Sequence, residues 1–205
     1  MSVVDYQFDL TGGHPALNLA NTVSRRHDPE RRREHLDTYA DLVSFARQSA
    51  LITPRQAKEL DLSARNNQSA ARRAFQRTIV LREALYRVFS AIAQHKIPAS
   101  SDLGLINDYT LDALRHRTLV AANGGYRWEW QSDARNSFER LLWPVAQSAA
   151  ELLTSEELKN VRFCEADDCE WLFLDNSRNR SRRWCDMKSC GNRAKARRHY
   201  ERVHS

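Results

Sequence analysis

The C-terminal stretch CDMKSCGNRAKARRHYERVHS (residues 185–205) places two cysteines directly before a run crowded with arginine, lysine and histidine. Two further cysteines lie upstream, and all four fall between residues 164 and 190. Each pair encloses four residues, and fifteen residues separate the pairs. Structural zinc takes four thiolates in a tetrahedron, and gaps of two to four residues within a pair are usual. The spacing therefore predicts one structural zinc ion held by Cys164, Cys169, Cys185 and Cys190.

A rival ligand set consists of Cys185, Cys190, His199 and His204. Four residues between the two histidines suit a zinc-binding helix, but only eight separate Cys190 from His199, against about twelve in the usual finger. This set would also leave the first cysteine pair without a metal. We favour the four thiolates, which fill the coordination sphere and make the metal structural rather than catalytic.

The segment WLFLDNSRNRSRRW (residues 171–184) joins the two pairs and has strand-like ends around a polar loop. We expect it to form a β-hairpin, followed by a helix whose first turn contains Cys190. This order is typical of a treble-clef-like finger, here over residues 161–205. A module of this size is near the lower limit for folding on core burial alone, so metal binding is expected to stabilise it.

Positive charge is concentrated at the C-terminal end. Residues 176–205 carry ten basic and two acidic side chains, a net +8, whereas the whole chain carries +6 and residues 1–175 therefore −2. Such asymmetry indicates a polyanionic partner, and we expect DNA. On a helical wheel the apolar residues Ala196, Tyr200 and Val203 lie opposite the basic face and are expected to dock on the hairpin. The candidate nucleic-acid contacts are Arg193, Lys195, Arg197, Arg198 and Arg202 of the helix and Arg180, Arg182 and Arg183 of the loop. The alternative is a protein-binding or RNA-associated zinc module without sequence-specific DNA binding.

Residues 1–160 are predicted to form a separate, mainly helical domain. Apolar residues recur at helical spacing, and Asn123-Gly124-Gly125 predicts one β-hairpin. Pro144 is expected to bend or interrupt the last helix. Trp128 and Trp130, which alternate on the hairpin, are expected to pack in the core or on the hairpin. The predicted helices start near Pro15 and, as a short helix, at Thr53-Pro54, and cover residues 37–51, 68–95, 102–116 and 134–153. Asp37 or Thr38 is the expected cap of the helix over residues 37–51, and the last helix carries an apolar stripe from Phe138 to Leu152. The fold class is therefore mainly α, with a small four-cysteine zinc finger at the C-terminus.

A second site is predicted near the N-terminus. His14, Asn18, Asn21 and Arg25 follow one another at spacings of four, three and four, which would place them near one face of a helix after a Gly-Gly turn. They are candidates for binding a small-molecule effector. The same polar groups could instead cap the helix and bond neighbouring loops, which is the commoner role.

Several classes of protein are disfavoured by the sequence. No apolar run approaches the 18 to 20 residues that span a bilayer, and the N-terminus lacks the features of a secretory signal. We therefore expect a cytoplasmic protein with no membrane partner. No catalytic motif or carboxylate dyad is recognised, so we do not expect an enzyme. A homodimer through the amphipathic helices of the larger domain would double the contact with DNA.

Two motifs resemble known families. Cys190-Gly191-Asn192-Arg193 and the residues after it resemble the CGNR zinc finger, whose four zinc-binding cysteines are matched here. Gly12-Gly13-His14-Pro15-Ala16-Leu17-Asn18 and the following Leu-Ala-Asn-Thr are similar to the start of the ABATE domain, with Asn18 where that motif usually has aspartate. The resemblance covers nearly the whole chain. It implies a bacterial transcription regulator, described as stress-induced, whose finger is proposed to bind DNA.

Overall fold

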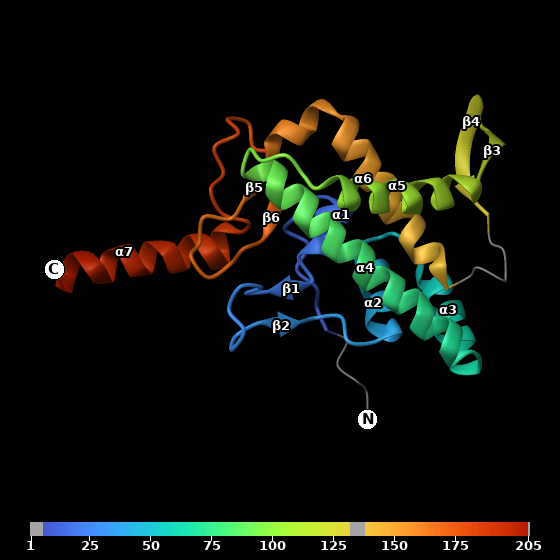
Figure 1. Cartoon of the computed structure of the whole chain (residues 1–205), viewed down its shortest axis with the longest axis horizontal. Helices are drawn as coiled ribbons and strands as arrows, with labels where there is room; N and C mark the ends of the chain where they lie inside the picture. The colour runs from blue at the N-terminus through green and yellow to red at the C-terminus, as the bar shows by residue number, and fades with distance from the viewer. Residues whose placement is uncertain (1–5, 132–137, 205) are drawn as a thin grey trace.

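The computed structural model describes residues 6–131 and 138–204. A helical body carries a long helix that projects from one end and a β-hairpin that projects from the other (Figure 1). The α-helices are α1 (Pro15–Ala20), α2 (Tyr39–Gln48), α3 (Pro54–Asn66), α4 (Gln68–Ala93), α5 (Ser100–Arg115), α6 (Leu142–Thr154) and α7 (Asn192–His204). The short turns η2 (Glu139–Leu141) and η3 (Glu156–Asn160) are 3-10 helices, and η4 (Met187–Gly191) is a π-helical turn. The strands form three antiparallel pairs, β1 (Val23–Ser24) with β2 (Arg33–Glu34), β3 (Arg117–Ala122) with β4 (Gly125–Trp130), and β5 (Val161–Phe163) with β6 (Leu172–Leu174).

Helix α4 is the centre of the body. Its apolar residues recur at spacings of three and four, so Leu81, Leu85, Val88 and Phe89 share one face and are all completely buried. This helix contacts α1, α2, α3, α5 and α6. The helix predicted over residues 68–95 is therefore confirmed, and so is the mainly α fold. In the part of the chain that the structure describes, no helix is long and apolar enough to cross a bilayer.

The helices before α4 begin where the cap residues predict. Thr38 accepts a hydrogen bond from the backbone N–H of Asp41, whose side chain in turn accepts from the Thr38 N–H, forming a capping box. Thr53 and Gln56 form a second capping box, with Pro54 at the first helical position. Helix α3 extends over 13 residues, longer than the short helix that this signal suggested.

The final helix of the body begins later than predicted. Residues 134–137 of the expected helix lie outside the described residues, and α6 starts at Leu142 after the η2 turn. Pro144 does not bend α6, because it lies in the first turn, where its missing N–H has no intrahelical partner; the predicted helix is instead interrupted just before it, at the change from η2 to α6. The predicted apolar stripe from Phe138 to Leu152 is buried.

The hairpin β3–β4 is confirmed, with its turn at Asn123-Gly124 and Gly124 at a φ of 81°. Only its base packs on the body, where Trp130 lies 6.1 Å from the ring of the buried Trp143. Trp128 is 52% exposed and packs on the hairpin itself, where the Arg117 guanidinium lies 5.0 Å from its ring, so Trp130 meets the expectation of core packing and Trp128 that of hairpin packing.

A buried arginine holds β2 against α4. Arg82 is 1% exposed and donates to both carboxylate oxygens of Glu34, at 2.6 and 2.8 Å, and to Glu83 at 2.9 Å. A bidentate carboxylate compensates the desolvation of a guanidinium better than a single contact does. The loop that follows β1, which carries Arg25 and His27, is thereby held beside the finger.

Strand β6 faces two different interiors. Because side chains alternate along a strand, Leu172 and Leu174 enter the core of the helical body while Phe173 points into a second, small core with the four cysteines. The bidentate contacts of Asn21 add a polar tie, with its Nδ2 donating to the Leu172 carbonyl at 2.7 Å and its Oδ1 accepting from the Leu172 N–H at 3.0 Å. The finger is therefore built onto the body.

Candidate metal centre and basic surface

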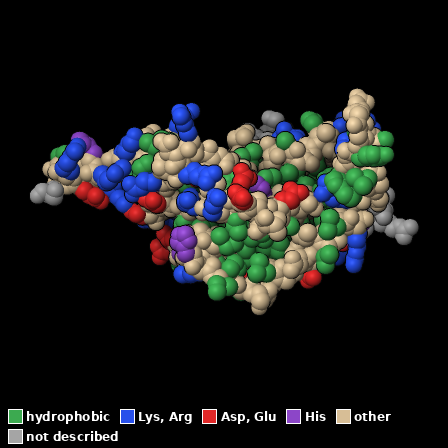
Figure 2. All heavy atoms as spheres, turned by 90° about the horizontal axis from the view of Figure 1, so that it is seen from above, with side chains coloured by type: hydrophobic (Ala, Val, Ile, Leu, Met, Phe, Trp, Pro, Cys, Tyr) green, Lys and Arg blue, Asp and Glu red, His purple; other side chains and the backbone are tan. Residues whose placement is uncertain are grey.

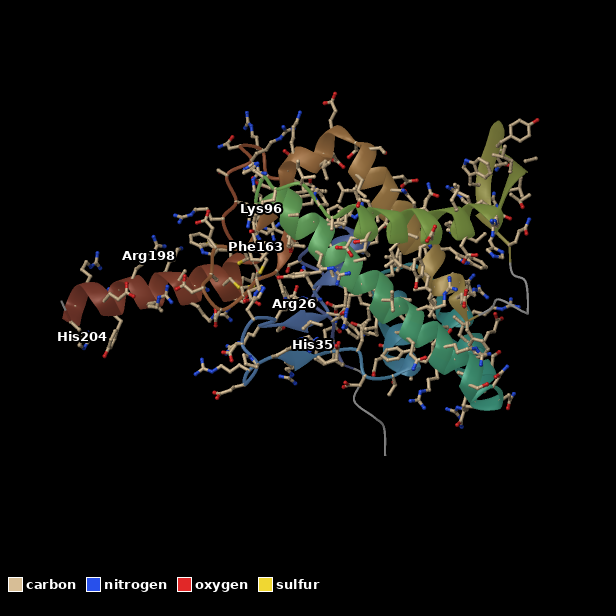
Figure 3. All side chains as sticks on the ribbon, viewed as in Figure 1. Arg26, His35, Lys96, Phe163, Arg198 and His204 are labelled. Carbon is tan, nitrogen blue, oxygen red and sulfur yellow. The ribbon has the colours of Figure 1, made fainter. Side chains whose placement is uncertain are left out.

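The four cysteines meet at the base of α7 (Figure 3). Their Sγ atoms all lie within 4.8 Å of one another, and each cysteine is at most 7% exposed. The Sγ of Cys185 lies 3.4 Å from that of Cys169 and 3.5 Å from that of Cys190. Four sulfurs at 2.3 Å from one zinc ion would be about 3.8 Å apart. The donor set and its spacing therefore fit a single tetrahedral ion with no open position.

The thiols perturb one another strongly. Hydrogen bonds from the neighbouring thiols, that of Cys169 first, lower the pKa of Cys164, whereas hydrogen bonding to Cys164 raises the pKa of Cys169 and of Cys185. Neighbouring thiols that compete for protons in this way are suited to exchange them for a cation.

The hairpin expected within residues 171–184 is wrong. β6 pairs instead with β5, upstream of the first cysteine pair, so the hairpin encloses Cys164 and Cys169. The segment after β6 is too polar to form a strand and is organised by Asp175, which is completely buried. Its carboxylate accepts from the backbone N–H of Ser177 and of Arg182, each at 3.0 Å. Although burial opposes ionisation, these hydrogen bonds hold the pKa of Asp175 below its usual value.

Cys190, Asn192 and Arg193 of the Cys-Gly-Asn-Arg motif have defined places around the metal centre. Cys190 lies in the η4 turn, which leads directly into α7, and Asn192 donates to the Lys188 carbonyl at 3.0 Å, which closes that turn. Arg193 donates to Asp168 at 3.0 Å and to the Cys190 sulfur at 3.3 Å. Burial lowers the pKa of Arg193, but the neighbouring Cys190 and Asp168 outweigh this effect and raise the pKa above its usual value. The motif therefore fixes the start of α7 to the first cysteine pair.

Four of the eight basic residues predicted to contact nucleic acid are tied to other segments of the protein, whereas Arg198 and Arg202 form hydrogen bonds only within α7, to Ala194 and His199. Arg197 pairs with Asp167 and Glu201, and Arg183 with Glu165 at 2.5 Å. Arg182 donates to the carbonyls of Trp184 at 2.8 Å, of Thr11 at 3.2 Å and of Cys185, with its guanidinium 4.5 Å from the Phe173 ring. The fourth is Arg193. Asp167 and Asp168 form ion pairs with Arg197 and Arg193, and no sequence pattern marked these two aspartates in advance.

The remaining basic residues lie on the open side of the finger. Lys195, Arg198 and Arg202 are exposed on α7, and Arg180 lies in the loop at a φ of 47°. None of these four forms an ion pair with another described residue. Figure 2 shows Lys and Arg side chains gathered over α7 and the adjoining part of the body.

The apolar stripe of α7 does not dock as expected. Tyr200 and Val203 are 62% and 63% exposed, and Ala196 is also exposed. The expected hairpin surface does not exist, and the helix extends beyond the finger (Figure 1). Ion pairs of Arg193 and Arg197 with the first cysteine pair's loop orient α7 instead.

The residues predicted as an effector site do not form one helical face. Helix α1 ends at Ala20, so Asn21 is its C-cap and Arg25 lies beyond it at a φ of 52°. Arg25 pairs with Asp168 at 3.2 Å, and Asn21 bonds to β6. Both residues therefore contact the finger, which is closer to the alternative role of bonding neighbouring segments.

His14 and Asn18 lie at the Gly-Gly turn that precedes α1. The Nδ1 of His14 and the Oδ1 of Asn18 are buried without a hydrogen-bond partner among the described residues. Gly12 is required here, because a Cβ would lie 2.6 Å from the Asn18 Oδ1 and 3.2 Å from its backbone N. Gly13 has a φ of 70°, which favours glycine.

The burial of His14 predicts a pH dependence of stability. Burial lowers the pKa of His14 from 6.5, against the opposing effect of Glu157 and Glu151. The unfolded chain therefore takes up this proton first, and stability is lost as the pH falls through about 6.5 toward the lower folded value. Between about pH 7.5 and 5.5 the urea midpoint should fall more for the native protein than for His14→Gln. Zinc binding weakens in acid in both proteins, so an equal fall in both would contradict the prediction.

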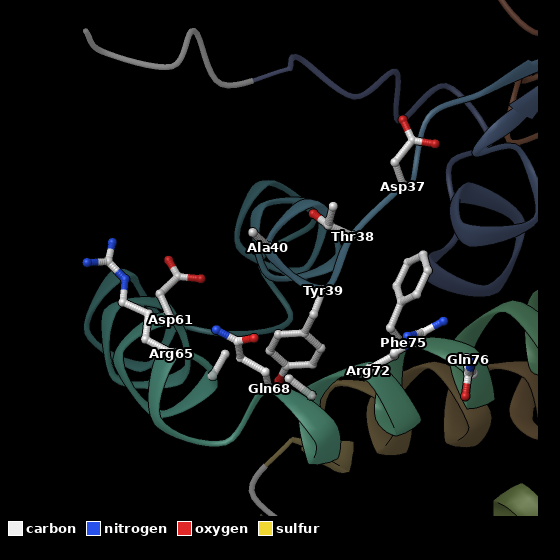
Figure 4. A pocket seen from close by; sticks show the side chains of 12 residues that line it. Asp37, Thr38, Tyr39, Ala40, Asp61, Arg65, Gln68, Arg72, Phe75 and Gln76 are labelled. Atoms are coloured by element: carbon white, nitrogen blue, oxygen red, sulfur yellow. The ribbon is translucent and has the colours of Figure 1, made fainter.

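A groove of about 940 Å³ lies between α2, α3 and α4 (Figure 4). Its lining includes Tyr39, Phe75 and Ala71, with Arg65 and Arg72 among the charged residues. None of the predicted effector residues lines it. No local sequence pattern predicts this groove, because its walls depend on how three helices pack.

Two family matches are consistent with the four-cysteine metal centre. Residues 13–156 match the ABATE family, described as "putative stress-induced transcription regulator", and residues 160–203 match the CGNR zinc finger. No curated protein matched the chain. The finger family and the buried four-cysteine cluster together assign one structural zinc ion. The chain belongs to the ABATE family and carries a C-terminal CGNR zinc finger.

Proposed function

We propose that the protein is a DNA-binding transcription regulator, not an enzyme, which contacts the phosphate backbone through the outer face of α7. The observation that carries this proposal is the division of the basic residues. Lys195, Arg198 and Arg202 recur at spacings of three and four, so they share one face, and this face has no acidic partner among the described residues. An exposed helix of 13 residues fits the major groove of B-DNA, about 12 Å wide.

The loop before the second cysteine pair adds to the proposed surface. Arg178 and Arg180 are exposed in it, and neither forms an ion pair within residues 6–131 and 138–204. Arg182, Arg183 and Arg197 are proposed to act indirectly, by holding the loop and α7 in place.

The N-terminal domain is proposed to regulate the finger. Asn21 and Arg25 link the end of α1 and the following loop to β6 and to Asp168. His27 extends this contact, with its Nδ1 2.6 Å from Glu170. A small-molecule effector bound to the helical body could therefore alter the finger through these contacts.

Salt dependence of binding to duplex DNA tests the proposal. Each phosphate contact contributes about −0.9 to the slope of log K against log salt. Arg198→Glu/Arg202→Glu should lower the affinity at least about tenfold and reduce the slope by about 2. Both side chains are exposed, so zinc content and far-UV circular dichroism should not change.

The matched control is Arg72→Glu/Arg73→Glu, which makes the same charge change on an exposed part of α4 far from α7 (Figure 1). It should bind DNA nearly as well as the native protein. Equal losses in both variants would show that net charge, and not the face of α7, is responsible. Undiminished DNA binding by the α7 variant would exclude this face, and preference for single-stranded RNA over duplex DNA would favour the alternative RNA-associated module.

A further inference from the structure

The β3–β4 hairpin has an apolar face that the body does not cover. The register places Leu119 opposite Trp128 and Ala121 opposite Tyr126, and opposed residues of an antiparallel pair lie on the same face. Tyr126 is 80% exposed, Leu119 55% and Trp128 52%. A two-stranded hairpin standing clear of a body is marginally stable in water, and an exposed aromatic face of this kind marks an interaction site.

The outer edge of β4 is also open. β3 and β4 form a two-stranded sheet, so each strand has an edge without a neighbouring strand among the described residues. Every residue from Gly125 to Glu129 is exposed. Such an edge presents unpaired N–H and C=O groups to a further strand. No proline or lysine lies in β4 to prevent pairing.

The sequence of β4 is complementary to itself. When two copies of Tyr126-Arg127-Trp128-Glu129-Trp130 run antiparallel with Trp128 opposite Trp128, each Arg127 faces Glu129 of the other copy. The aromatic residues 126, 128 and 130 then meet on the opposite face. Opposite charges and aromatic pairs are the favourable cross-strand combinations.

The exposed apolar area suits a dimer. Tyr126, Trp128 and Leu119 together expose roughly 400 Å². Leu111 and Leu114, in the last turns of α5 before β3, are 57% and 46% exposed and bring this to roughly 550 Å². One partner of a standard interface buries about 800 Å², of which about 57% is apolar, or about 450 Å².

We infer that β4 is a homodimer interface, at which two copies of the chain pair edge to edge into a four-stranded antiparallel sheet centred on Trp128. Most apolar residues of the amphipathic helices that the sequence suggested for this role are buried in the body. The interface is independent of DNA binding.

Sedimentation of the zinc-loaded full chain without DNA tests this inference. The native protein should form a dimer of twice 23.8 kDa. Arg127→Glu and Glu129→Arg, each alone, place like charges opposite each other at both symmetric positions and should raise the dimer dissociation constant at least about tenfold. Both side chains are exposed, and circular dichroism checks that each variant is folded.

Mixing the two variants provides the decisive control. In the mixed dimer, one copy has glutamate at both positions and the other has arginine at both, so every cross-strand pair is attractive and dimerisation should return. A native protein that stays monomeric at its highest soluble concentration would overturn the inference. So would a dimer that neither single variant weakens, or two variants that do not recombine.

Discussion

Chelation of the zinc ion is expected to unfold the two cysteine loops and helix α7, while β5 and β6 stay packed in the core of the helical body. The finger core consists of the four cysteines, Ala166 and Phe173, with Trp171 and Trp184 packed against it, which is too little apolar surface to fold without the metal. Zinc binding contributes about 10–16 kcal/mol in zinc-finger peptides. Loss of the ion also leaves the basic helix α7 with no buried residue to hold it.

Two readouts should change together. All four thiols should become reactive when the chelator is added, and the far-UV circular dichroism of α7 should decrease. Cys164→Ser should behave like the chelated protein, and the near-UV signal of the buried Trp143 reports whether the helical body remains folded. Thiols that stay protected after complete zinc removal would contradict the prediction.

Asn21→Ala should be the most damaging single polar substitution at the junction of body and finger. Asn21 is 3% exposed, and its amide satisfies both the N–H and the carbonyl of Leu172, which are buried. Leaving a buried polar group unsatisfied costs about 1–3 kcal/mol. Removing both contacts should therefore lower the free energy of unfolding by about 2–4 kcal/mol, measured by urea denaturation.

Two variants make this prediction specific. Asn21→Asp keeps an acceptor for the Leu172 N–H but has no donor for its carbonyl, so it should remain destabilised. Asn18→Ala is the matched control, because Asn18 is also buried at 8% exposure while its Oδ1 has no partner among the described residues. Asn18→Ala should lower the free energy of unfolding less than Asn21→Ala does. Equal losses at both positions would show that burial and not the contacts to Leu172 governs the effect.

Local patterns predicted the parts of this protein that local physics determines. The helical period of α4, the caps at Thr38 and Thr53 and the Asn-Gly turn of the hairpin are all read within a few residues. The spacing of the cysteines predicted the metal cluster, because two close pairs on a short connection can reach one ion.

The errors arose where distant segments decide the structure. β6 pairs with β5 across the first cysteine pair, and the buried carboxylate of Asp175 organises the loop after it. Neither fact is visible in residues 171–184 alone. Arg182, Arg193 and Arg197 look like surface charges in the sequence, but carbonyls and acidic side chains far along the chain bind them.

The alternation along β6 has a consequence for how this chain can be divided or exchanged. A cut at residue 160 would strip Val161, Leu172 and Leu174 from the interior of the first part and leave them facing water on the second. Neither half would be a self-sufficient building block. A fusion protein that received the finger alone would need another apolar surface to cover these three side chains. The two parts are therefore expected to be inherited together.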